Sequence, residues 1–160
     1  MIRLIVVASV VFFFLSLGSS FPFTNQVDMF CNRVNEIKIL PFKGEYVDDE
    51  VYNGLINLGK PAARCLVKKI VDNTVMVDPR KTPPYEGITV GDVALFVLLD
   101  ITKQNLENIL PPPVRDEYTK EGIYAYFRFV EKPENRKIIQ KNAYNLVNEM
   151  IDDARGTHRR

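Results

Sequence analysis

Histidine is almost absent from this chain of 160 residues, because its only copy is His158, close to the C-terminal end. Serine and cysteine nucleophiles usually need a histidine base within hydrogen-bond reach, so a catalytic triad is close to excluded. Zinc sites need three or four clustered cysteine, histidine or carboxylate ligands, and the glycines are too scattered for a phosphate-binding loop. We therefore expect no catalytic residue, no bound metal and no cofactor.

An excess of either charge is missing as well. The chain has 21 lysines and arginines against 20 aspartates and glutamates. Arg3 is the only charged residue among residues 1–20, so their loss would make the two numbers equal. Proteins that bind nucleic acid need a basic surface to meet the phosphates, so nucleic acid is not expected as a partner. The only basic cluster is residues 155–160, which we expect to form a disordered tail.

Long hydrophobic runs are also lacking. The apolar run at residues 4–17 is shorter than the roughly 20 residues that cross a bilayer as a helix. Arg3 precedes this run and the small residues 18–20 follow it, which is the pattern of a secretory signal peptide. The sequence predicts that residues 1–20 are cleaved on export, leaving a secreted or periplasmic protein without a stable membrane span.

Only two cysteines are present, Cys31 and Cys65. In an exported protein an even number of cysteines favours a disulfide. On the chain-entropy model a loop of about 35 residues would contribute roughly 3 to 4 kcal/mol to stability. We predict a Cys31–Cys65 disulfide, with two separately buried thiols as the alternative.

Residues 89–102 have apolar side chains on nearly every face, which is typical of a buried helix rather than a surface helix. A strand is the competing interpretation of a short apolar run. Thr89 followed by Asp92 favours the helix, because it matches an N-terminal cap with its reciprocal acidic partner. Asp100 near the end of the run is expected to face solvent or to cap the next segment. We take this helix as the centre of the fold.

The other segments predict shorter helices around this one, in a single all-α domain over residues 21–154 with five to six helices. Pro41 ends the first helix, Gly59 separates the second and third, and Gly122 weakens the fifth by about 1 kcal/mol relative to alanine. Residues 111–113 are three prolines, expected to be a stiff extended linker. The expected helices span residues 27–40, 48–58, 61–71, 114–130 and 133–154, with a short turn at 104–110.

Residues 55–72 resemble the two-helix unit of HEAT-type repeats, with Leu58-Gly59 at the turn, Ala62 after it, and Leu66, Ile70 and Asp72 along the second helix. The resemblance implies a compact, orthogonally packed or HEAT-like arrangement and an interaction role. Such arrays need several stacked units, and the chain has no second clear copy. The mature chain is also similar to exported bacterial proteins of no known function.

Residues 72–88 contain three prolines and a glycine, so they are expected to form a long connection without regular structure. Asp78, Arg80 and Tyr85 in this connection provide an acid, a guanidinium and an aromatic ring, which are groups that binding surfaces favour. We predict that these three residues contact a partner. The alternative is that Arg80 pairs with Asp78 or Asp92 and holds the connection against the central helix.

These observations favour a small exported helical module that acts by binding another protein. An immunity or inhibitor protein for an envelope-targeting enzyme is one such module. The alternatives are a purely structural envelope protein and a cell-wall glycan hydrolase that uses two carboxylates. The carboxylates considered for the hydrolase are Glu45, Asp92, Asp100, Glu117 and Glu121.

Overall fold

The computed structural model describes residues 23–42, 45–81 and 85–156, and within these ranges the fold is all-α with seven α-helices and no β-strand. The predicted signal peptide, residues 1–20, and most of the predicted tail, residues 157–160, lie outside the described residues. The α-helices are α1 (Phe23–Asn32), α2 (Glu50–Leu58), α3 (Lys60–Lys69), α4 (Val90–Thr102), α5 (Pro112–Glu121), α6 (Ile123–Val130) and α7 (Pro133–Gly156), and two single-turn 3-10 helices are η1 (Val34–Glu36) and η2 (Leu106–Asn108).

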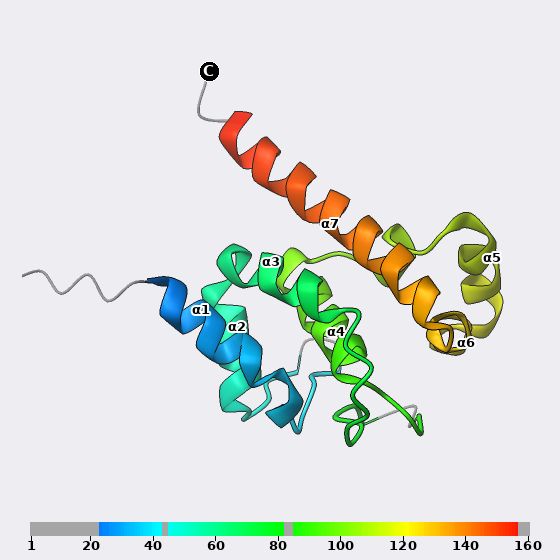
Figure 1. The fold of residues 1–160 in the computed structure, drawn as a ribbon, viewed down its shortest axis with the longest axis horizontal. Coiled ribbons are helices and arrows are strands. Elements are labelled where there is room, and N and C mark those ends of the chain that lie inside the picture. Colours follow the sequence, from blue (N-terminus) through cyan, green and yellow to red (C-terminus); the bar gives the residue numbers. More distant parts are fainter. Residues whose placement is uncertain (1–22, 43–44, 82–84, 157–160) are drawn as a thin grey trace, which may run out of the picture.

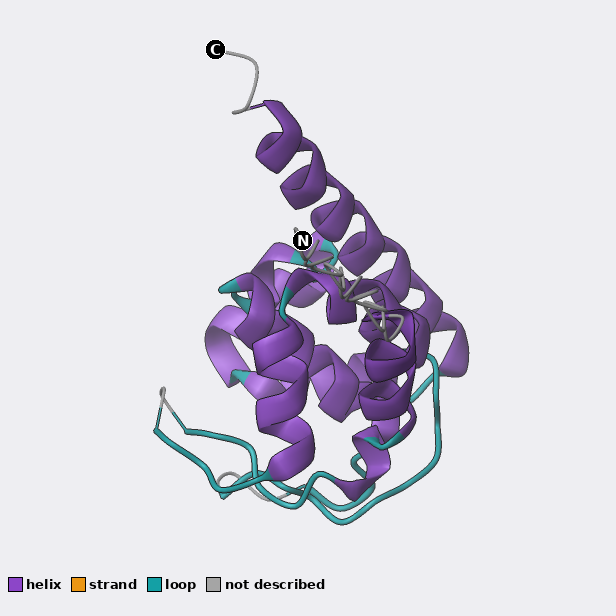
Figure 2. Cartoon of the chain, turned by 90° about the vertical axis from the view of Figure 1, so that its left-hand side faces the viewer, coloured by secondary structure: helices purple, strands orange, loops and turns teal. Residues whose placement is uncertain are grey.

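The helices form two groups that α7 connects (Figure 1). Helices α1 to α4 pack together on one side, α5 and α6 lie on the other side, and α7 contacts both α3 and α6. The loops gather at one end of the molecule (Figure 2). These loops include the connections before α2 and between α3 and α4. We call this part of the molecule the loop end; the rest is largely helical.

Helix α4 is the buried centre that the sequence predicts. Ten of its residues are buried, and its most extensive packing is against α3. Thr89 accepts a hydrogen bond from the Asp92 N–H while the Asp92 carboxylate accepts one from the Thr89 N–H, which is the predicted capping box. Gly91 donates its N–H to the Asp72 carbonyl at 2.9 Å, and a Cβ at this position would collide with the Ile70 carbonyl. A glycine is therefore required where α4 meets the end of α3.

The first predicted helix, residues 27–40, is wrong at both ends. Helix α1 begins at Phe23 and ends at Asn32, and after η1 the chain runs extended from Ile37 to Leu40. Ile37 and Leu40 are buried in the core. The apolar residues whose spacing predicted one continuous helix therefore lie in three different elements: a helix, a 3-10 turn and an extended segment.

The segment around the three prolines also differs from the prediction. Pro112 and Pro113 open α5 instead of forming a linker, because the fixed φ of proline suits the first helical turn, where no N–H is needed. Gly122, with φ of 63°, then ends α5 and starts α6, so the predicted helix 114–130 is two helices. This division accounts for the seventh helix beyond the five to six expected. Helix α7 continues to Gly156, so residues 155 and 156, predicted as tail, are helical.

The predicted pairing of Cys31 with Cys65 is confirmed. The two sulfurs are at bonding distance and the Cα atoms are 6.4 Å apart, which joins α1 to α3. Helices α2 and α3 flank Gly59 as the HEAT resemblance implies, and membership of that family stays a prediction. Among the described helices, none combines the length and the apolar character needed to cross a membrane.

A candidate binding groove at the loop end

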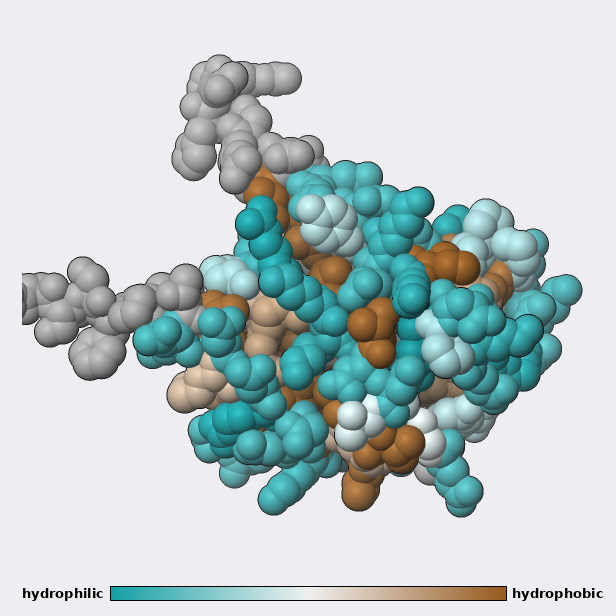
Figure 3. Space-filling model, viewed as in Figure 1, coloured by the Kyte–Doolittle hydropathy of each residue, from teal (hydrophilic) through white to brown (hydrophobic). Residues whose placement is uncertain are grey.

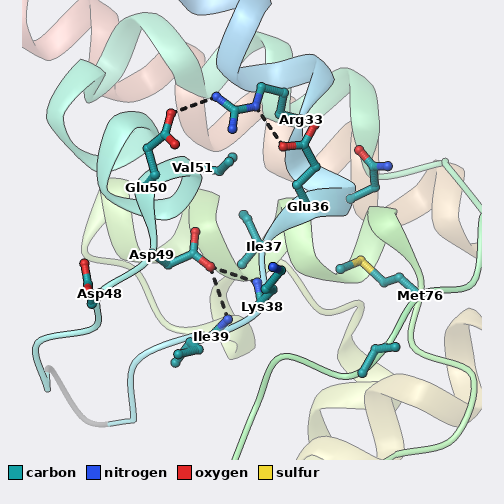
Figure 4. Close-up of a pocket in the computed structure, with 12 residues that line it drawn as sticks. Arg33, Glu36, Ile37, Lys38, Ile39, Asp48, Asp49, Glu50, Val51 and Met76 are labelled. Carbon is teal, nitrogen blue, oxygen red and sulfur yellow. Dashed lines mark hydrogen bonds and ion pairs between the residues drawn. The ribbon is translucent and has the colours of Figure 1, made fainter.

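A groove of about 760 Å³ opens at the loop end of the molecule (Figure 4). Its walls come from three segments that are distant in sequence: residues 35–39 after α1, residues 48–51 at the start of α2, and residues 76–77 after α3. Arg33 completes the lining. Figure 4 places Met76 across the groove from Ile37 and Lys38. The groove is therefore bounded by two extended segments and a helix N-terminus.

Asp49 holds two of these walls together. It caps the start of α2 by accepting the N–H of Tyr52 at 3.0 Å, and its second carboxylate oxygen accepts the N–H groups of Lys38 and Ile39 at 2.8 and 3.3 Å (Figure 4). Asp49 falls at the start of the helix predicted over residues 48–58, and that prediction does not include its contact with residues 38 and 39. Its actual role explains why the helix does not continue through Lys38 and Ile39, since the N–H groups of these two residues bind the carboxylate instead of helical carbonyls.

The charges around the groove are mostly negative. Arg33 binds Glu36 and Glu50 at 2.9 Å each, and the hydrogen bond from Arg33 lowers the pKa of Glu50. Asp48 and Lys38 are exposed at the groove, and neither forms an ion pair within the described part of the chain. The groove is therefore lined by four acidic residues, of which Asp49 is one, and by two basic residues, so its charge is negative on balance.

Large apolar side chains are exposed beside the groove. Val77 and Ile39 line the groove, and Val77 is 88% exposed. Val75, two residues before Val77 in the chain, is 67% exposed, and Tyr46, two residues before the wall at 48–51, is 85% exposed. Figure 3 shows hydrophobic atoms gathered at the lower edge of the molecule, over the loop between α3 and α4. Exposed apolar clusters of this kind mark interaction surfaces when they are contiguous. These residues are not among the predicted partner-binding residues, although the β-branched Val75 and Val77 at alternate positions are a signal for an extended segment.

The three predicted partner-binding residues are brought together, but their functional groups point inward. The Arg80 guanidinium binds Asp78 through two hydrogen bonds of 2.9 and 2.6 Å, and the backbone N–H groups of Arg80 and Tyr85 donate to the same carboxylate at 2.9 and 3.0 Å. The Arg80 guanidinium lies 4.7 Å from the ring centre of Phe127, and the Tyr85 ring stacks on Phe127 at 4.0 Å. These are the contacts expected of the alternative in which Arg80 pairs with Asp78 and holds the connection in place.

The same contacts set the electrostatics of this cluster. Burial alone would raise the pKa of Asp78, but the hydrogen bonds from Arg80 and from the Tyr85 N–H together lower it. The side chains of Arg80 and Asp78 are only 12% and 13% exposed. A role of Asp78, Arg80 and Tyr85 in contacting a partner stays a prediction.

A buried network around Asp92 was not predicted. Arg136 of α7 donates to both Asp92 oxygens at 2.8 and 3.1 Å, and the Tyr126 hydroxyl donates to Asp92 at 2.7 Å. Burial first, and the Asp92 charge second, raise the pKa of Tyr126 well above its ordinary value. Because each group has a partner, this network joins α4, α6 and α7 as part of the structure. No local sequence signal links residues 92 and 136.

Comparison with protein-family models, curated proteins and solved structures finds no match to this chain.

The five carboxylates considered for a hydrolase are placed as follows. Glu117 and Glu121 come together, and both bind Arg128 on the surface. The other three are separate: Glu45 binds Lys81, Asp92 belongs to the buried network, and Asp100 accepts a hydrogen bond from the Tyr52 hydroxyl at 3.0 Å.

Asp100 therefore does not simply face solvent or cap the next segment. It is partly buried and links α4 to α2, and burial raises its pKa more than the Tyr52 hydrogen bond lowers it. Its hydrogen-bonding neighbour is the Tyr52 hydroxyl, so this carboxyl group has a structural contact of its own. Among the residues that the structure describes, no group of three histidine, cysteine, aspartate or glutamate side chains is arranged to hold a metal ion.

Proposed function

We propose that this protein is a small exported binding module that recognises another protein through the groove at its loop end. The observation that supports the proposal most directly is the exposure of Val77 in the groove wall and of Val75 two residues before it. Exposed valine side chains cost free energy in water, and a partner that covers them recovers about 1.5 kcal/mol for each one fully buried. A more specific form of the proposal is an immunity or inhibitor protein directed at an envelope enzyme.

Export is supported by two independent features of the chain. The first is the signal-like pattern of residues 1–20. The second is the pairing of Cys31 with Cys65, because disulfides form and persist mainly in oxidising compartments outside the cytosol. The proposed location is therefore the periplasm or the extracellular space.

Binding is favoured over glycan hydrolysis by the contacts of the acidic residues. At the groove, Asp49 is used as a helix cap, while Glu36 and Glu50 are both bound to Arg33. A hydrolase needs one protonated and one ionised carboxyl group facing a substrate. Three of the four groove carboxylates therefore have local partners, Asp48 being the exception, and the exposed apolar side chains nearby suit contact with a protein surface.

The proposal is tested by affinity capture from the exported fraction of the source cells, followed by reconstitution with the purified partner. We expect Val75→Ser/Val77→Ser to weaken the reconstituted complex by at least about tenfold, because each truncation removes apolar surface from the contact. The matched control is Ile138→Ser/Tyr144→Ser, which changes two exposed apolar residues on α7.

The control is expected to bind within about twofold of the unmodified protein, since neutral contacts outside an interface contribute little. The proposal fails if the groove variant binds its partner as well as the unmodified protein does. It fails equally if only the α7 variant loses affinity, because the binding surface would then lie elsewhere.

A further inference from the structure

The segment before α4 has an open backbone edge. Val75 and Thr89 form an antiparallel bridge, in which Met76 donates to the Ile88 carbonyl at 3.0 Å and Val90 donates to the Thr74 carbonyl at 2.9 Å. In an extended chain, successive residues direct their N–H and C=O groups to opposite edges. The backbone groups of Val75 and Val77 therefore face away from this pairing, and within the described chain they have no hydrogen-bond partner.

This open edge faces the groove. Pro79 lies two residues beyond Val77, and its carbonyl accepts the Leu40 N–H at 2.9 Å. Leu40 directly follows the groove wall formed by Ile37 to Ile39. The two extended segments thus meet at Leu40 and Pro79, and Figure 4 shows them bordering the groove from opposite sides. No other backbone hydrogen bond joins them among the described residues.

We infer that the groove receives an extended segment of the partner protein, which adds as a β-strand along the backbone of Val75 to Val77. This inference rests on the proposed function and specifies its binding mode. Strand addition uses main-chain hydrogen bonds for affinity and alternate side chains for specificity. The exposed side chains of Val75 and Val77 lie on one face of this edge, so the partner strand presents apolar residues at every second position.

The charge of the groove indicates which residues lie between the apolar ones in the partner strand. Glu36, Asp48 and Glu50 border the groove against Arg33 and Lys38, and Asp48 has no salt-bridge partner in the described chain. An acidic groove favours a strand that carries lysine or arginine between its apolar residues, because complementary charge speeds encounter and disfavours acidic competitors. The occupant is therefore a basic, alternating extended segment of another protein.

The first test uses a short capped peptide of alternating valine and lysine and follows amide hydrogen exchange in the full-length protein. In the free protein the Val75 and Val77 amides exchange rapidly, because they lack hydrogen-bond partners. At saturation with the peptide we expect their exchange to slow by at least about tenfold. The Met76 amide, already bonded to Ile88, serves as the internal reference and changes little.

The second test addresses charge. Replacing lysine by glutamate in the peptide, or introducing Asp48→Lys in the protein, is expected to weaken binding about tenfold through like-charge contact. Asp116→Lys makes the same charge change on an exposed acid of α5, on the far side of the molecule, and is expected to alter binding by less than about twofold.

Three outcomes overturn the inference. The peptide fails to bind at about 1 mM, or it binds while the Val75 and Val77 amides remain unprotected, or these amides become protected in a dimer of the protein itself. The proposed function is judged separately by the serine variants. If the native partner depends on the Val75 and Val77 side chains while both amides stay exposed in the complex, the binding module stands and strand addition fails.

Discussion

Arg136 shows how strongly a single buried residue is constrained in this fold. Its guanidinium and the Asp92 carboxylate are 7% and 1% exposed, and the pair is held by two hydrogen bonds. Taking an isolated charge out of water is costly, so a buried ion pair depends on both partners being present. The pair is therefore expected to matter most when one half is removed.

We expect Arg136→Met to lower the free energy of unfolding by about 3 to 5 kcal/mol, because Asp92 would remain buried without its cation. Urea unfolding measures this change. The matched control is Arg128→Met, which removes an arginine that is 48% exposed and bound to Glu117 and Glu121. Its loss is expected to stay below about 1 kcal/mol, as is usual for surface ion pairs.

The double variant Asp92→Asn/Arg136→Met distinguishes the effect of losing the ion pair from the effect of leaving the Asp92 charge buried without a partner. It is expected to be more stable than Arg136→Met, because a neutral amide replaces the unpaired carboxylate. A similar small loss for Arg136→Met and Arg128→Met would contradict the assigned role of the buried pair.

What the sequence can predict at this scale depends on distance along the chain. The Thr89–Asp92 capping box was predictable, because both residues lie in one helical turn and have a known mutual geometry. The Asp92–Arg136 pair joins residues 44 positions apart, and no spacing rule connects them. Val75 and Val77 were predictable in part. Their alternation indicates an extended segment, but only the packed structure shows which backbone edge of that segment has no hydrogen-bond partner.

At the scale of elements, the sequence predicted the existence of helices better than their ends. Helix α4 has its predicted bounds because strong local signals mark both its cap and its apolar run. The extended segment 37–40 was missed because its geometry comes from Asp49, about ten residues later in the chain. Gly122 was recognised as a weak point, but propensity alone did not distinguish a weakened helix from two helices.

Asp78 binds within the α3–α4 connection, whereas Asp100 links α4 to α2, and the contributions of the two carboxyl groups to stability have opposite dependence on pH. The pKa of Asp78 is lowered, so its ionised form stabilises the fold above the unfolded value of 3.8, and this contribution is lost as the pH falls through its folded pKa. The pKa of Asp100 is raised, so its carboxyl favours folding when protonated, and that contribution is lost as the pH rises through its folded pKa.

We therefore expect Asp78→Asn to lower stability at neutral pH by about 1 to 3 kcal/mol, since it removes a charged acceptor of four hydrogen bonds, three from Arg80 and one from the Tyr85 N–H. Asp100→Asn should raise stability at neutral pH, because an amide still accepts from Tyr52 without placing a charge in a partly buried site. Both differences should shrink when urea unfolding is repeated at about pH 3. A loss of stability in both variants at neutral pH would contradict the opposite pKa directions.

For the whole molecule, the buried core and the proposed binding surface are separated in space. Helix α4 and its neighbours form one continuous apolar cluster, while the proposed groove uses the connections at one end. Such an arrangement lets binding residues vary without changing the core. It also means that the all-α class was predictable from apolar periodicity, whereas the proposed binding surface depends on where the loops converge.

The disulfide is the one covalent link between distant parts of this architecture. It joins α1 to α3 across 34 positions in the chain, and α1 also packs against α2, beside the groove. Replacing both cysteines by alanine should lower the free energy of unfolding by roughly 3 to 4 kcal/mol, because the unfolded chain regains the entropy of an open loop. For a domain of about 140 residues this corresponds to a fall of about 10 °C in Tm.

Thermal unfolding with and without reductant measures the effect, and the alanine variant is the control because its melting curve should not respond to reductant. An unchanged melting curve for the unmodified protein after complete reduction would show that the disulfide does not contribute to stability. Since α4 packs chiefly on α3, loss of the bond should first increase amide exchange in α1 while α4 stays protected. The order of opening therefore tests whether the buried helix, rather than the covalent link, holds the domain together.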